Sequence, residues 1–136
     1  MSWLKYTVGL ATLISAVAHA VKAEPTSLKC NGWQSEYEDG QLVDQYGFSI
    51  RILLEDDGSF YARYSNAERG FYGSVIKTDR TYELTMVDTN LSTIFYLFID
   101  RETGSASQKT FIDAIHFILT LKGTSQCSLD DAIPKF

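Results

Sequence analysis

His116 is the only histidine outside the N-terminal leader segment, and it is the side chain best suited to act as a general base near neutral pH. A Ser-His-Asp or Cys-His site would need a nucleophile beside this histidine. No nucleophile motif accompanies it, and the local alternation predicts that His116 lies in mid-strand on a polar face. We therefore expect a surface histidine and assign no catalytic residue.

Carboxylates gather in two stretches of the chain that could bind a hard cation. They are Glu36, Glu38, Asp39 and Asp44 in the first stretch, and Glu55, Asp56 and Asp57 in the second. Calcium needs about six to eight oxygen ligands in a shaped loop, and neither stretch has the spaced Asp-x-Asp-x-Asp-Gly pattern. A carboxylate pair for glycoside cleavage is defined by a separation that sequence does not give. We expect acidic turns here, with no metal and no cofactor.

The N-terminal 23 residues have the plan of a secretory signal peptide. Lys5 provides a positive charge, an apolar stretch follows, and small residues allow cleavage after Ala20 or Ala23. The apolar stretch is short for a membrane span, which needs about 20 apolar residues. We therefore predict a signal peptide over 1–23 and a single exported domain over 24–136, in the periplasm or outside the cell. A retained N-terminal anchor is the alternative.

Export has consequences for charge and for cysteine chemistry. Removal of the leader takes away Lys5 and Lys22 and no acidic residue, so the formal net charge of −5 becomes −7. Such an acidic surface argues against nucleic acid and anionic membranes as partners. Cys30 and Cys127 are the two cysteines, and an oxidising compartment favours a disulfide between them. A metal pair is the weaker alternative, because two thiols alone make no zinc site.

The run 94–99 is apolar at every position, which makes it the most unusual stretch of the chain. Ile94, Tyr96 and Phe98 would occupy one face of a strand, and Phe95, Leu97 and Ile99 the other. A strand of a one-sided sheet should not be apolar on both faces. Either both faces are covered, or the outer face meets a partner or ligand.

Either set of alternating residues can precede the turn at Asp100. We take Phe95, Leu97 and Ile99 as the outer strip and as candidate partner-binding residues. Leu97→Lys should then be tolerated, while Phe98→Lys should unfold the domain by burying an unpaired charge. Other aromatic residues, such as Tyr61 and Tyr72, could line a pocket or pack across strands.

Alternating apolar and polar residues between Gly or Asp turns predict an all-β fold. The expected strands are 28–37, 43–55, 60–64, 71–77, 81–86, 94–99, 105–110 and 114–122, followed by a tail over 123–136. The Asp56-Asp57-Gly58 turn fits a three-residue hairpin loop with a left-handed glycine, and it sets Leu54 opposite Phe60. About eight hairpin-linked strands favour an antiparallel up-and-down meander that closes into a small barrel, with a sandwich as the alternative.

The end of the chain resembles small, uncharacterised exported bacterial proteins. The shared features are an Ile-Asp-Arg-x-Thr-Gly turn, here 99–104, then Gly123 and Cys127, and a Lys-Phe ending. The resemblance covers about the last third of the chain, implies a bacterial periplasmic or secreted setting, and supplies no activity.

These observations lead us to expect a non-enzymatic binding protein. The first hypothesis is a protein-interaction module, inhibitor-like in character, that binds another exported protein or itself through the outer face of the run 94–99. A lipocalin-like carrier of a small hydrophobic ligand is the alternative, and a hydrolase with an unrecognised site is the third.

Overall fold

The computed structural model describes residues 26–130, which form an all-β domain without a helix. The predicted leader and its two cleavage positions lie outside the described residues. The strands are β1 (Thr26–Glu38), β2 (Gln41–Leu54), β3 (Ser59–Tyr64), β4 (Phe71–Lys77), β5 (Thr81–Asp88), β6 (Thr93–Asp100), β7 (Ser105–Asp113) and β8 (Ile118–Leu129).

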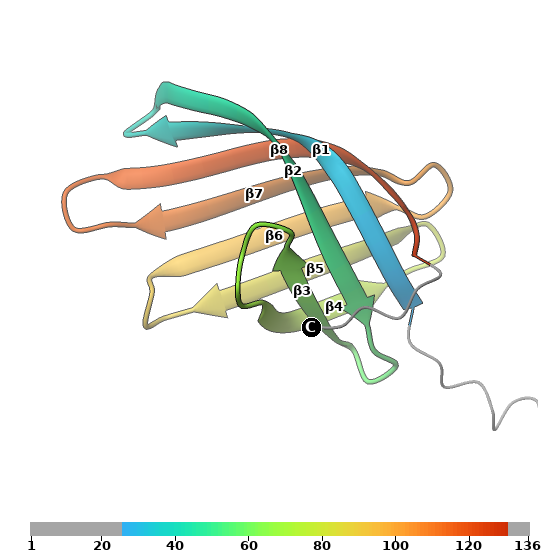
Figure 1. Ribbon diagram of the computed structural model, residues 1–136. Coiled ribbons are helices and arrows are strands. Elements are labelled where there is room, and N and C mark those ends of the chain that lie inside the picture. The colour runs from blue at the N-terminus through green and yellow to red at the C-terminus, as the bar shows by residue number, and fades with distance from the viewer. Residues whose placement is uncertain (1–25, 131–136) are drawn as a thin grey trace, which may run out of the picture.

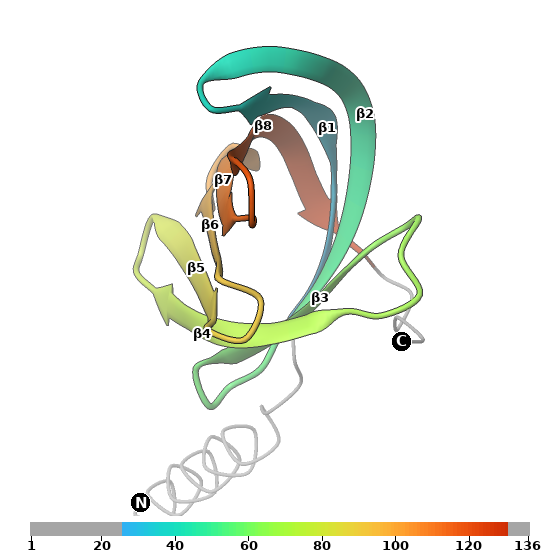
Figure 2. The same cartoon turned by 90° about the vertical axis from the view of Figure 1, so that its left-hand side faces the viewer.

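The eight strands form a closed barrel in which each pairs antiparallel with the next in sequence, and β8 pairs with β1 (Figure 1). The predicted meander barrel is confirmed, and the sandwich alternative is wrong. Figure 2 views the ring of strands from the end that carries the β1–β2 hairpin. Full closure removes the two sheet edges that an open meander would leave unpaired.

Alternation along the strands separates a packed interior from a solvent-exposed exterior. On β2 and β3 the inward set is fully or almost fully buried and pairs as the turn predicted, with Leu54 opposite Phe60 and Ile52 opposite Ala62. Inside the barrel, Phe60, Phe71 and Phe95 pack edge to face or tilted, with centroids 5.0–6.5 Å apart. Such contacts add to the burial of the rings themselves, so this cluster anchors the core.

Two predicted turns have the backbone geometry that their sequences require. Gly58 has φ +89° and Gly104 has φ +80°, in the left-handed region that glycine adopts without a Cβ clash. In the β6–β7 turn, Asp100 Oδ1 accepts hydrogen bonds from the backbone N–H groups of Glu102 and Thr103, at 2.8 and 3.1 Å. The pKa of Asp100 is lowered because these donors favour its ionised form.

The predicted disulfide is present and closes the barrel seam. Cys30 on β1 and Cys127 on β8 are directly paired, with Cα atoms 3.9 Å apart, and they are bonded to each other. Both are buried among the core residues. The bond therefore joins the first and last strands. The pairing of these two strands is the one strand pairing of the barrel that links residues far apart in the sequence.

The eighth strand was predicted too early in the sequence. Asp113 pairs with Ile118, so the residues between them form the β7–β8 loop, where the backbone N–H of Ala114 donates to the carbonyl of Phe117 at 3.0 Å. Ile115 is therefore almost fully exposed. The predicted tail contributes its first residues to β8, which runs to Leu129. This loop contains neither glycine nor proline, so the usual turn signal is missing.

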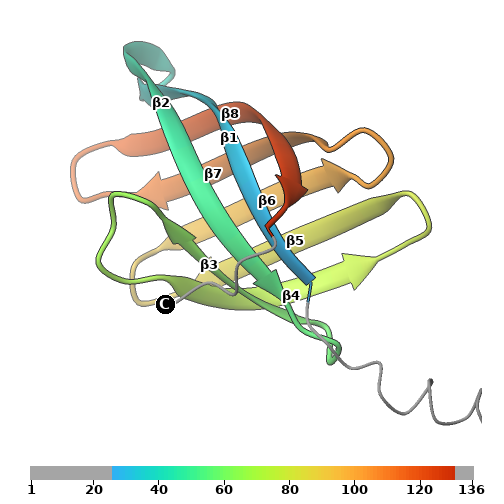
Figure 3. The same cartoon turned by 45° about the vertical axis from the view of Figure 1, so that its right-hand side comes forward.

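The barrel has one filled end and one more open end. At the end where β2 stops and β3 begins, the interior is occupied by the disulfide and by aliphatic side chains. Toward the opposite end β2 extends beyond β3, since β3 ends at Tyr64 opposite Ile50 while β2 begins at Gln41 (Figure 3). The loop after β3 lies beside this overhanging half of β2, where the N–H of Ser65 donates to the carbonyl of Ser49 at 2.9 Å.

Candidate functional site

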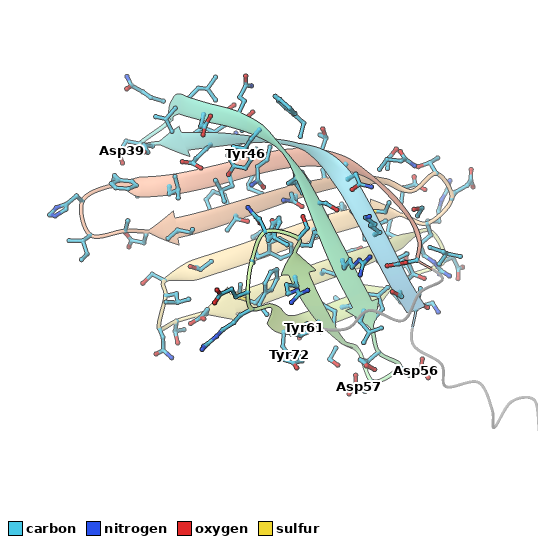
Figure 4. The ribbon with its side chains drawn as sticks, in the orientation of Figure 1. Asp39, Tyr46, Asp56, Asp57, Tyr61 and Tyr72 are labelled. Carbon is cyan, nitrogen blue, oxygen red and sulfur yellow. A yellow bond between two sulfur atoms is a disulfide. The ribbon has the colours of Figure 1, made fainter. Side chains whose placement is uncertain are left out.

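The structure places the residues with catalytic potential apart from one another. His116 is exposed in the β7–β8 loop, rather than in mid-strand as predicted. Within residues 26–130, no three or more His, Cys, Asp or Glu side chains come together as a metal site would require. The two acidic stretches lie at different ends of the barrel, as Asp39 shows against Asp56 and Asp57 in Figure 4.

These acidic residues take part in turn geometry. Asp57 Oδ1 accepts hydrogen bonds from the hydroxyl and the backbone N–H of Ser59, at 2.6 and 3.0 Å, and these bonds lower the pKa of Asp57. Asp39 Oδ1 accepts the backbone N–H of Ile118 at 2.9 Å and so ties the β1–β2 turn to the start of β8. At the end of a hairpin, each of these carboxylates accepts a backbone N–H group, in the place that a backbone carbonyl would otherwise take.

The outer face of β6 is the reverse of the one we predicted. Phe95, Leu97 and Ile99 are at most 3% exposed and point into the barrel, whereas Tyr96 is 47% exposed and Phe98 is 50% exposed. The pairing on β7 explains this orientation: Lys109 lies directly opposite Tyr96, and the face that holds a lysine must be the solvent face. The candidate partner-binding strip was therefore assigned to the wrong side of the strand.

The correct outer face is hollowed into a groove of about 710 Å³ that crosses β5, β6, β7 and β8. We call it the outer groove and define it by the outward side chains Glu83, Tyr96, Phe98, Ser107, Lys109 and Lys122. Tyr96 and Phe98 stand beside the small side chain of Ser107, which leaves the space between neighbouring strands open. The two half-exposed aromatic rings thus border a concave surface that is largely apolar, with charged side chains among its lining.

The outer groove has two lysines, Lys109 and Lys122, and one glutamate, Glu83, in its lining. Lys109 and Lys122 are directly opposite on β7 and β8, an arrangement that destabilises a sheet when the charges are alike. The ammonium groups lie over different rings: that of Lys109 is 5.6 Å from the Phe111 centroid, and that of Lys122 is 5.4 Å from the Tyr37 centroid. An anionic group between them would relieve the repulsion.

Inside the barrel, polar side chains form a hydrogen-bonded chain that the sequence did not reveal. Gln108 Nε2 donates to Gln34 Oε1 at 2.7 Å and to the Tyr64 hydroxyl at 2.8 Å. Gln34 Nε2 donates to the Tyr46 hydroxyl at 3.2 Å, and that hydroxyl donates to Glu36 Oε1 at 3.1 Å. We call these five residues the interior polar chain, which links four strands.

The remaining aromatic candidates divide between two environments. Tyr61 and Tyr72 pair directly across β3 and β4 with ring centroids 4.6 Å apart, and they lie together at the lower side of the barrel in Figure 4. Tyr61 accepts the backbone N–H of Gly70 at 3.1 Å. These contacts give the Tyr61–Tyr72 pair a cross-strand packing role, whereas Phe95 belongs to the core.

The chain matches no protein-family model, and no curated protein is similar to it. Over residues 26–130, no helix has the length and apolar character needed to cross a bilayer.

Proposed function

We propose that this chain is an exported, non-enzymatic binding protein whose outer groove docks an acidic segment of another exported protein. The observation that carries the proposal is the pair of half-exposed aromatic rings, Tyr96 and Phe98, on a hollowed face beside Lys109 and Lys122. A few residues, often aromatic ones, supply most of the binding energy at protein interfaces, and complementary charges give specificity. Together they favour a partner segment with a carboxylate next to an apolar side chain.

The energetics of the groove agree with this partner chemistry. A segment that covered Phe98 would remove the exposed half of its ring from water, which contributes roughly 1 kcal/mol at the usual value for a fully buried phenylalanine. A carboxylate between Lys109 and Lys122 would be attracted by both ammonium groups and would offset their mutual repulsion. The proposed docking therefore combines an apolar contact with charge complementarity.

Export is the second part of the proposal, and two features support it. The first 23 residues have the composition of a signal peptide, and the Cys30–Cys127 disulfide is compatible with an oxidising compartment. The intact mass of native protein should match a chain that starts at Val21 or Glu24 and is two hydrogens lighter than the dithiol. Retention of Met1, or two free thiols on non-reducing alkylation, would contradict export.

A carrier of a small hydrophobic ligand receives less support from the same structure. The filled end of the barrel is occupied by core side chains such as Ile50, Ile52 and Phe60, which are fully buried. The opposite half of the interior contains the interior polar chain, so a lipophilic ligand there would lie against polar side chains instead of apolar ones. Co-purified lipid detected by mass spectrometry would favour this carrier over the docking module.

The test of the docking proposal is selection of a random displayed peptide library on the immobilised protein, with a Phe98→Ser variant as the counter-selection. We expect enriched peptides to carry Asp or Glu next to an aromatic or aliphatic residue, and to bind Phe98→Ser about fivefold more weakly, which equals about 1 kcal/mol. Leu129→Ser is the matched control, because Leu129 is also largely exposed but is the last residue of β8, opposite Leu28 on β1 and outside the lining of the groove.

Two results would contradict the docking proposal. Peptides that bind wild type and Phe98→Ser equally would show that the groove is not the contact surface. A concentration-dependent dimer in sedimentation equilibrium that Phe98→Ser abolishes would make the occupant a second copy of this chain.

A further inference from the structure

The outer groove has opposite charges at its two sides. Glu83 lies on β5 at one side, where its Oε2 accepts a hydrogen bond from the Thr81 hydroxyl at 3.3 Å. It forms no ion pair within 4 Å with a lysine or arginine among residues 26–130. Lys109 and Lys122 lie on β7 and β8, at the other side. A segment that crosses the groove from β5 to β8 therefore meets a negative charge first and two positive charges at its far end.

The space between the two charged sides is bordered by aromatic rings. Phe98 is directly opposite Glu83 on β6, and Tyr96 is the next outward residue of the same strand. Both rings are about half exposed. Ser107, directly opposite Phe98 on β7, has a small side chain and leaves room beside the ring. A side chain that enters here would contact aromatic carbon, with a carboxylate on one side and two ammonium groups on the other.

The geometry of the sheet gives the spacing of these features. Neighbouring strands lie about 4.8 Å apart, so Lys109 is about 10 Å from Glu83 across two strand spacings, and Lys122 is about 14 Å away across three. Both lysines also lie two residues, about 6.6 Å, along the strand direction, because Lys109 is opposite Tyr96 and not Phe98. Combining the two components places the Cα atoms of the lysines about 12 Å and about 16 Å from that of Glu83.

An extended peptide matches this spacing. Each of its residues rises by about 3.3 Å and alternate side chains point to the same face, so positions i, i+2 and i+4 face the groove and span about 13 Å. That span falls between the two distances from Glu83 to the lysines. With a cation of the peptide at Glu83, the side chain at i+2 would lie between the rings of Tyr96 and Phe98. A carboxylate at i+4 would then lie between the two ammonium groups.

We propose that the outer groove recognises an extended segment with the pattern cation–x–apolar–x–carboxylate, in which x is any residue and Glu83 selects the cation. This inference rests on the docking function proposed above and adds to it the conformation of the segment, its spacing and a third contact. Complementary charges give specificity more than affinity, so Glu83 acts as a specificity-determining residue. The apolar and acidic side chains that lie side by side in the groove are two positions apart in the segment.

The test is an NMR titration of the protein with three five-residue peptides, each blocked at both ends. The patterned peptide is Lys-Ala-Phe-Ala-Glu, the contiguous peptide of the same composition is Ala-Lys-Phe-Glu-Ala, and the charge-reversed peptide is Glu-Ala-Phe-Ala-Glu. We expect the patterned peptide to bind with a dissociation constant on the order of 1 mM, as suits a small ligand. The backbone amide signals that move should be those of residues 83–85, 96–98 and 107–109.

The other two peptides should bind more weakly for different reasons. In the contiguous peptide an extended backbone points the phenylalanine and the two charged side chains to opposite faces. In the charge-reversed peptide the first side chain is repelled by Glu83. Each should bind about fivefold more weakly than the patterned peptide, which equals about 1 kcal/mol.

Variants assign the effect to Glu83. Glu83→Lys should reverse the preference, so that the charge-reversed peptide binds about fivefold more tightly than the patterned one. Glu83→Gln, which keeps the shape of the side chain, should bring the two affinities to within about twofold. Glu68→Lys is the matched control and should leave the preference unchanged, because Glu68 is an exposed carboxylate in the loop between β3 and β4, outside the groove lining.

Three outcomes would overturn the proposed pattern. Equal affinity of wild type for the patterned and charge-reversed peptides would remove the role of Glu83, and equal affinity for the contiguous peptide would exclude the extended conformation. In both cases, weaker binding to Phe98→Ser would still support docking in the groove. No saturable change with the patterned peptide up to about 10 mM, ten times the expected dissociation constant, would also exclude the pattern. The library selection on wild type and Phe98→Ser then decides the docking proposal separately.

Discussion

Adjacent residues on β6 should respond in opposite ways to the introduction of a lysine. Leu97 is 1% exposed and points into the barrel, whereas the neighbouring Phe98 is 50% exposed on the outer groove. Leu97→Lys and Phe98→Lys place the same charged side chain on either side of one strand, one position apart. Any general effect of lysine on strand formation is therefore shared, and the difference between the variants reports orientation alone.

The expected cost of Leu97→Lys follows from its surroundings. Truncation of a buried leucine costs about 2–5 kcal/mol, and an unpaired buried ammonium adds an effective penalty of several kcal/mol. The ammonium group of the introduced lysine does not reach water easily. Leu84 and Gln108, which lie directly opposite Leu97 on the two flanking strands, are also buried. The sum is comparable with the whole stability of a typical domain, about 5–15 kcal/mol, so we expect Leu97→Lys to unfold the protein.

By the same reasoning, Phe98→Lys should lower the free energy of unfolding only slightly. Half of the ring is already in water, so the loss of apolar burial is roughly 1 kcal/mol. Glu83 lies directly opposite on β5, and a cross-strand pair of opposite charges returns about 0.2–1 kcal/mol. The net change in the free energy of unfolding should therefore stay within about 1 kcal/mol.

Denaturant unfolding followed by circular dichroism provides the measurement, and the disulfide should be kept intact in both variants. We expect a wild-type-like transition for Phe98→Lys and no cooperative transition for Leu97→Lys. A stable Leu97→Lys protein together with an unfolded Phe98→Lys protein would mean that β6 presents its other face. Loss of folding in both variants would show that the outer groove is covered.

Three further outcomes follow from the fold. Replacing Cys30 and Cys127 together by alanine should lower the free energy of unfolding by roughly 4–5 kcal/mol in the chain-entropy model, because the bond spans 97 residues; a loss under about 1 kcal/mol in urea titration would contradict this. Gly58→Ala should cost about 1 kcal/mol from backbone strain at φ +89° alone, since an added Cβ meets nothing closer than 3.8 Å; equal urea midpoints for the two proteins would refute the strain. Burial raises the pKa of Tyr64 from 10.0 to about 12. As the pH rises between these values, the unfolded chain loses the Tyr64 proton before the folded protein does, so the free energy of unfolding falls, by about 3 kcal/mol at most. Tyr64→Phe should remove this part of the pH dependence.

Local sequence rules predicted those features of the fold that depend on neighbouring residues. The Asp-Asp-Gly turn and the alternation on both sides of it determined the register of β2 against β3, with Leu54 opposite Phe60. The same local chemistry identified the turn at Asp100–Gly104, where a carboxylate accepts two backbone N–H groups. These signals are reliable because the atoms that interact are within a few residues of one another.

The orientation of β6 could have been inferred from its partner strand but not from β6 itself. Apolar residues at every position leave no periodicity to read. Its hairpin partner β7 does alternate, with Ala106, Gln108 and Thr110 inside, and Lys109 outside opposite Tyr96. The lysine therefore marks the solvent face of both strands, once the hairpin register is known.

The interior polar chain depends on contacts that sequence does not bring together. Gln34 and Gln108 are separated by 74 residues and meet only because the barrel closes. A glutamine at an inward position looks like any polar residue in a strand, so nothing local distinguishes it. Likewise the more open end of the barrel arises from the unequal lengths of β2 and β3, a property of strand ends that sequence patterns define poorly.

The most direct test of the docking function is a charge-swap cycle between the outer groove and a selected acidic peptide. Isothermal titration calorimetry would compare wild type with a Lys109→Glu and Lys122→Glu double variant, each against the acidic peptide and against the same peptide with lysine in place of its carboxylate. We predict that the double variant loses at least about tenfold in affinity for the acidic peptide and gains affinity for the lysine peptide. Dissociation constants for the acidic peptide that agree within about twofold between the two proteins would contradict the account.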